Sequence, residues 1–235
     1  MTWLWRISFS LGCLAPVWAA NVSGSVALAD SRDPSVRRHK DFSGVVVWLT
    51  PANGGSVPAG RQPSKATMAQ IEKHFKPHVL AIPVGGVVEF PNFDPIYHNA
   101  FSSYDGQVFD VHLYPPGTSR SVVFKLPGIV RVFCNIHPTM SAVIAVLETP
   151  WFAVSGRSGN WEMHGVPAGQ YKLHVFHERA TEETLHGLEQ RVTITGGDSV
   201  TLAPLTVSEA GYIPAPHKNK YGNDYPPPGG YSVTQ

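Results

Sequence analysis

The pattern of hydrophobic and polar positions along the chain predicts short β-strands separated by turns. Val22–Ala29 alternates loosely, and Gly44–Thr50 (GVVVWLT) is a continuous run rich in the β-branched residues that favour strands. Further strand-like runs lie at Val79–Val84, Val87–Phe90, Ile129–Cys134, Ala142–Leu147, Tyr171–His177, Arg191–Thr195 and Ser199–Leu202. Short strands with a turn signal about every 8 to 12 residues are typical of sandwiches and barrels. Only Thr67–Lys73 and Glu182–Glu189 are compatible with helices.

Composition supports an all-β chain and narrows the classes of function. Glycine (22) and proline (21) are frequent among the 235 residues, and proline breaks helix interiors, so a helical bundle is excluded. The formal net charge is +1, which provides no overall basic field for binding nucleic acid. Since no apolar stretch of about 18 residues follows the N-terminus, we expect no membrane span after removal of a signal.

The N-terminus has the layout of an export signal. Arg6 supplies the positive charge, Ile7–Trp18 is apolar, and small residues precede a cleavage point after Ala19 or Ala20. We therefore expect residues 1–20 to be a signal peptide and the protein to be periplasmic or secreted, with retention as an anchor as the alternative. Cleavage would leave Cys134 as the only cysteine, which excludes an internal disulfide.

Cys134 begins the sequence CNIHPTM, which spaces a cysteine, a histidine and a methionine at intervals of three residues. The segment lies between two apolar strands, and a loop at the end of a sheet can direct three side chains toward one point. His98, ahead of a separate strand, is placed to be a distant further ligand. Two histidines, a thiolate and a weak axial methionine form the mononuclear copper site of electron-transfer proteins. The alternative is that the spacing arose by chance in a loop.

Three stretches of the same region resemble the small blue copper proteins, the cupredoxins. They are Phe75-Lys76-Pro77, the run VGGVVEFPNFDPIYHN that ends at Asn99, and CNIHPTM. The resemblance covers about Thr67–Glu148, and the short ligand loop is similar to that of amicyanin. More widely, the chain resembles exported proteins of the methylamine-utilisation or plastocyanin-like type. In those proteins the cupredoxin is followed by a segment similar to carboxypeptidase regulatory-like domains, a pattern that Phe152–His177 fits.

The resemblance implies a role for each matching residue. His98, Cys134 and His137 would be the strong ligands of one type 1 copper, and Met140 would be the weak axial ligand. Asn99 would connect the two ligand loops through hydrogen bonds. His137 would be the near-surface ligand through which electrons pass. The docking rim around it would be formed by Pro95, Ile96, Pro138 and Thr139, the last being polar where amicyanin has an aromatic residue.

These observations predict an all-β chain with two sandwiches. A Greek-key cupredoxin sandwich would span residues 66–149. A second, carboxypeptidase-regulatory-like sandwich would be discontinuous, with its first strands in 21–55 and the remainder in 150–207, because about five short strands after 150 are few for a closed sandwich. The competing layout pairs Val45–Trp48 with the strands of 78–147. Residues 208–235 are rich in proline, glycine and tyrosine, and we expect them to be disordered.

The function that this reading favours is that of a periplasmic one-electron carrier rather than an enzyme, working with a redox partner protein that the sequence does not name. Two alternatives stay open. One is an exported copper chaperone or store, against which the presence of only four methionines argues. The other is a structural or interaction sandwich in which the copper motif is vestigial.

Overall fold

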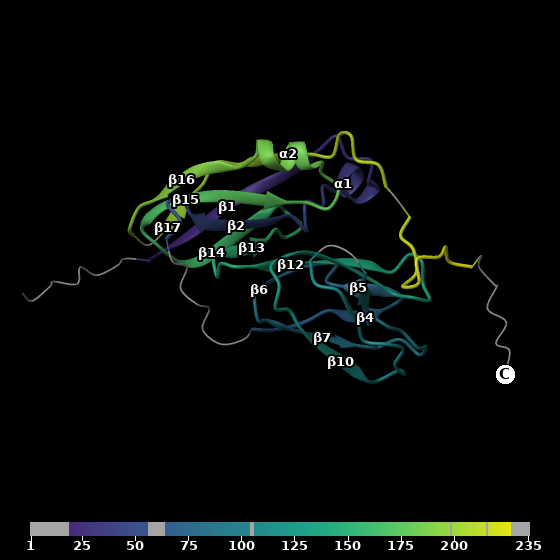
Figure 1. Cartoon of the computed structure of the whole chain (residues 1–235). Coiled ribbons are helices and arrows are strands. Elements are labelled where there is room, and N and C mark those ends of the chain that lie inside the picture. The colour runs from purple at the N-terminus through teal and green to yellow at the C-terminus, as the bar shows by residue number, and fades with distance from the viewer. Residues whose placement is uncertain (1–18, 56–63, 104–105, 198, 215, 227–235) are drawn as a thin grey trace, which may run out of the picture.

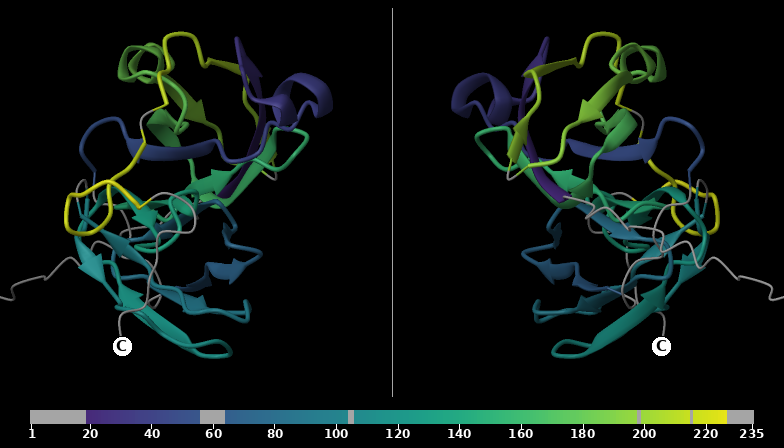
Figure 2. Two further views of the ribbon diagram at one scale, coloured as in Figure 1. Left: turned by 90° about the vertical axis from the view of Figure 1, so that its right-hand side faces the viewer. Right: turned by 90° about the vertical axis from the view of Figure 1, so that its left-hand side faces the viewer.

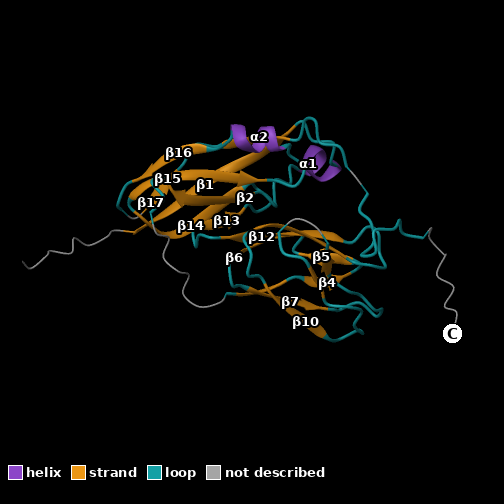
Figure 3. Ribbon diagram, viewed as in Figure 1, coloured by secondary structure: helices purple, strands orange, loops and turns teal. Residues whose placement is uncertain are grey.

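The computed structural model describes residues 19–55, 64–103, 106–197, 199–214 and 216–226. Its regular secondary structure is almost entirely β, joined by loops and two short helices (Figure 3). The strands form two parts stacked on each other (Figure 1). The predicted all-β class with sandwich domains is therefore confirmed. The predicted signal peptide falls mainly on residues 1–18, outside the described residues, while Ala19 and Ala20 begin the first strand. Within the described residues, no helix has the length and apolar character to cross a membrane.

One part, the host sandwich, is built from strands at both ends of the chain. Its outer sheet pairs β1 (Ala19–Ala29) antiparallel with β14 (Asn160–Pro167) and parallel with β17 (Ser199–Thr201) and β18 (Leu205–Ser208). Its inner sheet has the order β13 (Phe152–Val154), β2 (Val46–Pro51), β15 (Gly169–Phe176) and β16 (Gln190–Ile194). Thus β2 pairs with β13 and β15, whereas the competing layout placed it beside strands of 78–147.

The other part, the cupredoxin part, is inserted between β2 and β13. One sheet has the order β10 (Ser119–Val123), β7 (Val87–Pro91) and β3 (Lys65–Thr67). The facing sheet has the order β6 (Val79–Pro83), β12 (Ser141–Leu147), β11 (Gly128–Phe133), β8 (Phe101–Ser102) and β9 (Phe109–Asp110). A separate hairpin of β4 (Ala69–Ile71) and β5 (His74–Lys76) completes the cupredoxin part. Its core contains the fully buried rings of Phe90, Tyr114 and Phe124.

Two strands explain why the parts stack. In β12, Ala142, Ile144 and Val146 belong to the cupredoxin core, whereas the alternate residues point to the other face and pack between the two parts. The strand β2 behaves in the same way, with Val46 in that shared cluster and Val47 in the core of the host sandwich. A strand buried on both faces has a continuous apolar sequence rather than an alternating one. The runs VVVWL and AVIAVL are therefore the two sides of the inter-domain contact.

The helices differ from the expectation. The helix α2 (Glu182–Gly187) forms where the sequence allowed one, but residues 67–73 contribute to β3, β4 and a turn instead. The helix α1 (Pro34–His39) lies in a segment where the sequence predicted no helix. The Asp33 carboxylate accepts a 2.7 Å hydrogen bond from the Ser35 N–H, and Pro34 occupies the first turn. This cap and first-turn proline are the signal that the sequence analysis missed.

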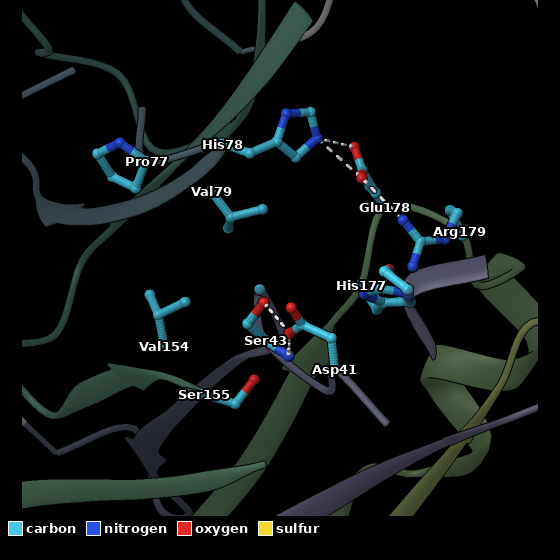
Figure 4. A pocket seen from close by; sticks show the side chains of 12 residues that line it. Asp41, Ser43, Pro77, His78, Val79, Val154, Ser155, His177, Glu178 and Arg179 are labelled. Atoms are coloured by element: carbon cyan, nitrogen blue, oxygen red, sulfur yellow. Dashed lines mark hydrogen bonds and ion pairs between the residues drawn. The ribbon is translucent and has the colours of Figure 1, made fainter. Parts of the chain in front are cut away.

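A small cavity of about 250 Å³ lies where the two parts meet (Figure 4). On one side His78, from the cupredoxin part, is 2.8 Å from both carboxylate oxygens of Glu178, from the host sandwich. Burial lowers the pKa of His78, but the carboxylate of Glu178 outweighs that effect, so the pKa of His78 is raised above 6.5. Burial opposes ionisation of Glu178 as well, yet His78 and Arg179 bring its pKa below 4.5. The pair is therefore an ionic contact across the domain boundary.

This ion pair predicts a pH-dependent stability. The contribution of His78 is complete below its ordinary value of 6.5 and is lost as the pH rises through its raised pKa. The contribution of Glu178 is complete above 4.5 and is lost as the pH falls. We expect His78→Gln to lower the free energy of unfolding by less than about 1 kcal/mol at pH 5.5, because the imidazole is half-exposed, and by less at pH 9. Urea unfolding at both pH values tests this, with the exposed His39→Gln as control; equal losses at both would contradict it.

Candidate metal centre

Two loops at one end of the cupredoxin part bring the predicted ligands together. His98 lies between β7 and β8, and its carbonyl accepts a 2.9 Å hydrogen bond from the Tyr114 N–H. Residues 134–140 connect β11 to β12. The Cys134 N–H donates to the Met140 carbonyl at 3.1 Å, and the Met140 N–H donates to the His137 carbonyl at 3.1 Å. This short loop between two paired strands is therefore closed by its own backbone.

The donor atoms of His98, Cys134 and His137 all lie within 4.8 Å of one another. The Cys134 Sγ is 3.8 Å from the His98 Nδ1 and 3.5 Å from the His137 Nδ1. His98 and Cys134 are fully buried, and His137 is partly exposed. Across the described part of the chain, this is the one group of histidine, cysteine and acidic side chains arranged to hold a metal ion.

The donor set fits copper. Copper accepts the borderline imidazole nitrogens and the soft thiolate together. Met140, the fourth residue of the sequence prediction, is also fully buried, in the same core cluster as Cys134. A structural zinc site requires four strong ligands, and Cys134 has no second cysteine beside it in the described chain.

The protonation of the donors follows from burial. Burial raises the pKa of the Cys134 thiol, so the thiolate requires a bound cation to stabilise it. The pKa of His137 is lowered to about 4, mainly by burial and secondly by the nearby His98. The His137 ring is therefore neutral at neutral pH, which leaves one ring nitrogen free to bind a metal.

Asp94 orients His98, a role that was not predicted from the sequence. The His98 Nε2 lies 2.8 Å from the Asp94 Oδ2, and both side chains are buried. Asp94 also accepts hydrogen bonds from the backbone N–H groups of Glu72 (2.6 Å) and Lys73 (2.8 Å). A carboxylate here fixes the proton on Nε2 and leaves Nδ1 free toward Cys134, the usual arrangement when a carboxylate hydrogen-bonds a histidine that binds a metal. The spacing D-x-x-x-H was the available signal.

Replacing Asp94 with asparagine is expected to weaken copper binding about 10-fold or more, within the range for residues that hydrogen-bond a metal-binding histidine. The amide has one acceptor oxygen, so its NH₂ group would face an N–H donor that the carboxylate now accepts. Competition with a chelator of known affinity measures the change. The control is Asp41→Asn, which removes a carboxylate bonded to Ser43 in the host sandwich. Equal affinities for Asp94→Asn and the wild type would rule out this orienting role.

Asn99 and the predicted rim residues lie in the two ligand loops. The Asn99 Oδ1 accepts a 2.5 Å hydrogen bond from the Asn135 N–H, which connects the loops. Of the predicted rim, Ile96 is partly exposed, and the exposed members are Pro95, Pro138 and Thr139. Phe93 and Tyr97, which the sequence analysis did not name, are 66% and 56% exposed beside them. The surface of these loops is thus more aromatic than expected.

The C-terminal residues correct another expectation. We predicted disorder for 208–235. In the described residues, β18 extends to Ser208 and residues 216–226 lie against the ligand loop, while 215 and 227–235 lie outside the described residues. Figure 2 shows this segment leaving the host sandwich and lying beside the cupredoxin part. Hydrogen bonds and ring contacts hold this segment rather than burial of aliphatic side chains, which is why a composition poor in aliphatic residues favoured disorder.

Comparison with known proteins gives the family. The chain is similar to methylamine utilization protein MauL of Methylorubrum extorquens, with 34% identity over 84 residues that cover 35% of this chain and 72% of that protein. This chain belongs to the MauL family. The MauL relationship agrees with the resemblance to methylamine-utilisation proteins seen in the sequence. No protein-family model matches the chain, so the carboxypeptidase-regulatory-like part of the prediction stays a prediction.

Solved structures that resemble this MauL-family chain include cupredoxins. A purple cupredoxin from Nitrosopumilus maritimus is 24% identical, covers 35% of this chain and 99% of its own length, and has a TM-score of 0.33. Amicyanin from Paracoccus versutus is 16% identical, with 42% and 97% covered and a TM-score of 0.33. A copper-containing nitrite reductase from Thermus scotoductus is 26% identical, with 52% and 28% covered and a TM-score of 0.35.

Proposed function

We propose that this chain is a periplasmic one-electron carrier with a single type 1 copper, held by His98, Cys134, His137 and Met140. The observation that supports it best is the mutual distance of the three strong donors, all within 4.8 Å in a site where two are fully buried. When bound, copper would supply the one-electron couple. The residues would supply a fixed set of ligands and, in His137, a partly exposed ring.

The surroundings of the donors favour electron transfer over release of the metal. Asp94 orients His98, Asn99 connects the ligand loops, and the strands β11 and β12 hold both ends of residues 134–140. A rigid set of ligands changes little between the two oxidation states, which favours rapid electron exchange. His137 is the partly exposed ligand, so an electron would pass through its ring to a redox partner protein docked on the rim.

Titration of the metal-free protein with Cu(II) tests this proposal. We expect one equivalent to produce an intense visible thiolate-to-copper absorption band, and a mild reductant to bleach it reversibly. Absence of the band would contradict the proposal. A colourless protein that binds Cu(I) and passes it to an acceptor would instead favour a copper chaperone or store.

A further inference from the structure

The C-terminal segment that we expected to be disordered makes specific contacts with the ligand loop. The hydroxyl of Tyr225 donates a 2.7 Å hydrogen bond to the carbonyl of Cys134 itself. The His217 ring stacks on Phe133, the residue before Cys134, with ring centroids 4.2 Å apart and planes inclined by 25°. Tyr225 meets His217 edge-on, and its hydroxyl is 3.2 Å from the His217 Nδ1. The carbonyl of the cysteine and the ring of the residue before it are thus both contacted by residues 83 or more positions later in the chain.

A closed ring of hydrogen bonds continues these contacts to the second ligand loop. The Asn135 N–H donates to the Asn99 Oδ1 at 2.5 Å, and the Asn99 Nδ2 donates to Asp110 at 3.2 Å. The Lys220 Nζ donates to the other Asp110 oxygen at 2.7 Å. The Lys220 N–H then donates to the Asn135 Oδ1 at 3.0 Å, which closes the ring. Each of the two loops therefore contributes one asparagine, and the C-terminal segment contributes the lysine.

The ring is partly shielded from water. The side chains of Lys220 and Asp110 are 22% and 27% exposed. A lysine to carboxylate contact at this depth has a better-defined geometry than a fully exposed pair, which contributes little. Asn99 is almost completely buried, so its amide depends on Asp110 and Asn135 as partners.

We propose that residues 216–226 form a C-terminal clasp that fixes the copper-ligand loop, with Lys220 and Tyr225 as positioning residues. This proposal rests on the proposed function. Tyr225 holds the peptide unit that follows the Cys134 side chain, and Lys220 holds Asn135 and, through Asp110, Asn99. Both residues act on the groups that set where the Cys134 Sγ lies relative to the two imidazoles. Neither would contact the metal.

The test compares two clasp variants with two controls in the full chain. Tyr225→Phe removes one hydroxyl, and Lys220→Met removes the ammonium that closes the ring. The controls are Tyr212→Phe, earlier in the same C-terminal region, and Lys172→Met, whose ammonium pairs with Glu189 in the host sandwich. Copper affinity is measured by chelator competition, and the thiolate-to-copper band and the copper EPR spectrum are recorded for each. Unfolding in urea is measured in parallel.

We expect each clasp variant to bind copper about 10-fold more weakly, as loss of a contact that positions a ligand does. Each should also shift the thiolate-to-copper band. The controls should match the wild type, and Lys220→Arg should restore the affinity. If both clasp variants keep the affinity and both spectra of a wild type that binds copper, the clasp proposal is overturned and the proposed function stands. If the controls shift as far as the clasp variants, the clasp proposal is also overturned. If the wild type binds no copper, the proposed function is overturned, and the clasp proposal that rests on it is overturned with it.

Discussion

Replacing Cys134 with serine is expected to abolish the visible absorption of the copper-loaded protein and to weaken copper binding by more than about 100-fold. The absorption arises from the thiolate, and a serine hydroxyl is a hard, protonated donor that copper accepts poorly beside two imidazoles. Loss of a ligand should weaken binding more than loss of a residue that only hydrogen-bonds a ligand, which typically costs about 10- to 100-fold. Titration with Cu(II), followed by absorption and by chelator competition, measures both quantities.

The exchange of sulfur for oxygen is nearly isosteric, so the effect can be separated from unfolding. Cys134 is completely buried, and a small loss of stability is expected from its hydroxyl. Urea unfolding of the metal-free variant should show a cooperative transition close to that of the wild type. Cys13→Ser in the full chain is the matched control and should leave the band intact. A Cys134→Ser protein with the same colour as the wild type would place the metal elsewhere.

Replacing Phe90 with alanine is expected to lower the free energy of unfolding by about 3–5 kcal/mol. Phe90 is fully buried in the cupredoxin core, where it packs edge-on to Phe75 with centroids 6.4 Å apart and stacks on Phe109 at 5.9 Å. Its removal leaves a cavity between these rings, since the surrounding strands can relax only partly. Chemical unfolding followed by circular dichroism measures the loss.

Phe93 provides the control because the same residue type lies three positions later but is 66% exposed. We expect Phe93→Ala to change the free energy of unfolding by less than about 0.5 kcal/mol. Similar losses for the two variants would contradict the arrangement in which β7 directs Phe90 into the core. Although Phe93 lies in a ligand loop, its side chain is exposed, so Phe93→Ala should keep the copper band.

The strands at the centre of the fold could be predicted because buried strands have continuous apolar sequences. The runs VVVWL and AVIAVL are apolar at every position since both faces of β2 and β12 are covered. The sequence analysis identified these strands but not the reason for their uniform character. The helix α1 was missed because its capping pair, Asp33 and Pro34, was outweighed by the charged residues that follow.

The proposed ligands could be selected from local spacing, whereas the residues that orient them could not. Cys134, His137 and Met140 lie within seven residues, and the structure places the first two close to His98. Asp94 and Lys220 act only through tertiary contacts, with the backbone of Glu72 and Lys73 in one case and with Asp110 in the other. Such contacts leave no periodicity in the sequence. Composition alone therefore made the C-terminal segment look unstructured.

The discontinuous host sandwich determines the order in which the chain can fold. Ser25 pairs with Asn160 and Val26 with Leu205, so β1 has no partner until the last third of the chain is available. The strand pairs of the cupredoxin part join residues between 65 and 147, so this part can complete its pairing earlier. Contacts so distant in sequence form slowly, and β1 and β2 stay unpaired meanwhile. An interrupted chain that ended before residue 152 would leave both β1 and β2 without partners, the kind of strand edges from which aggregation begins.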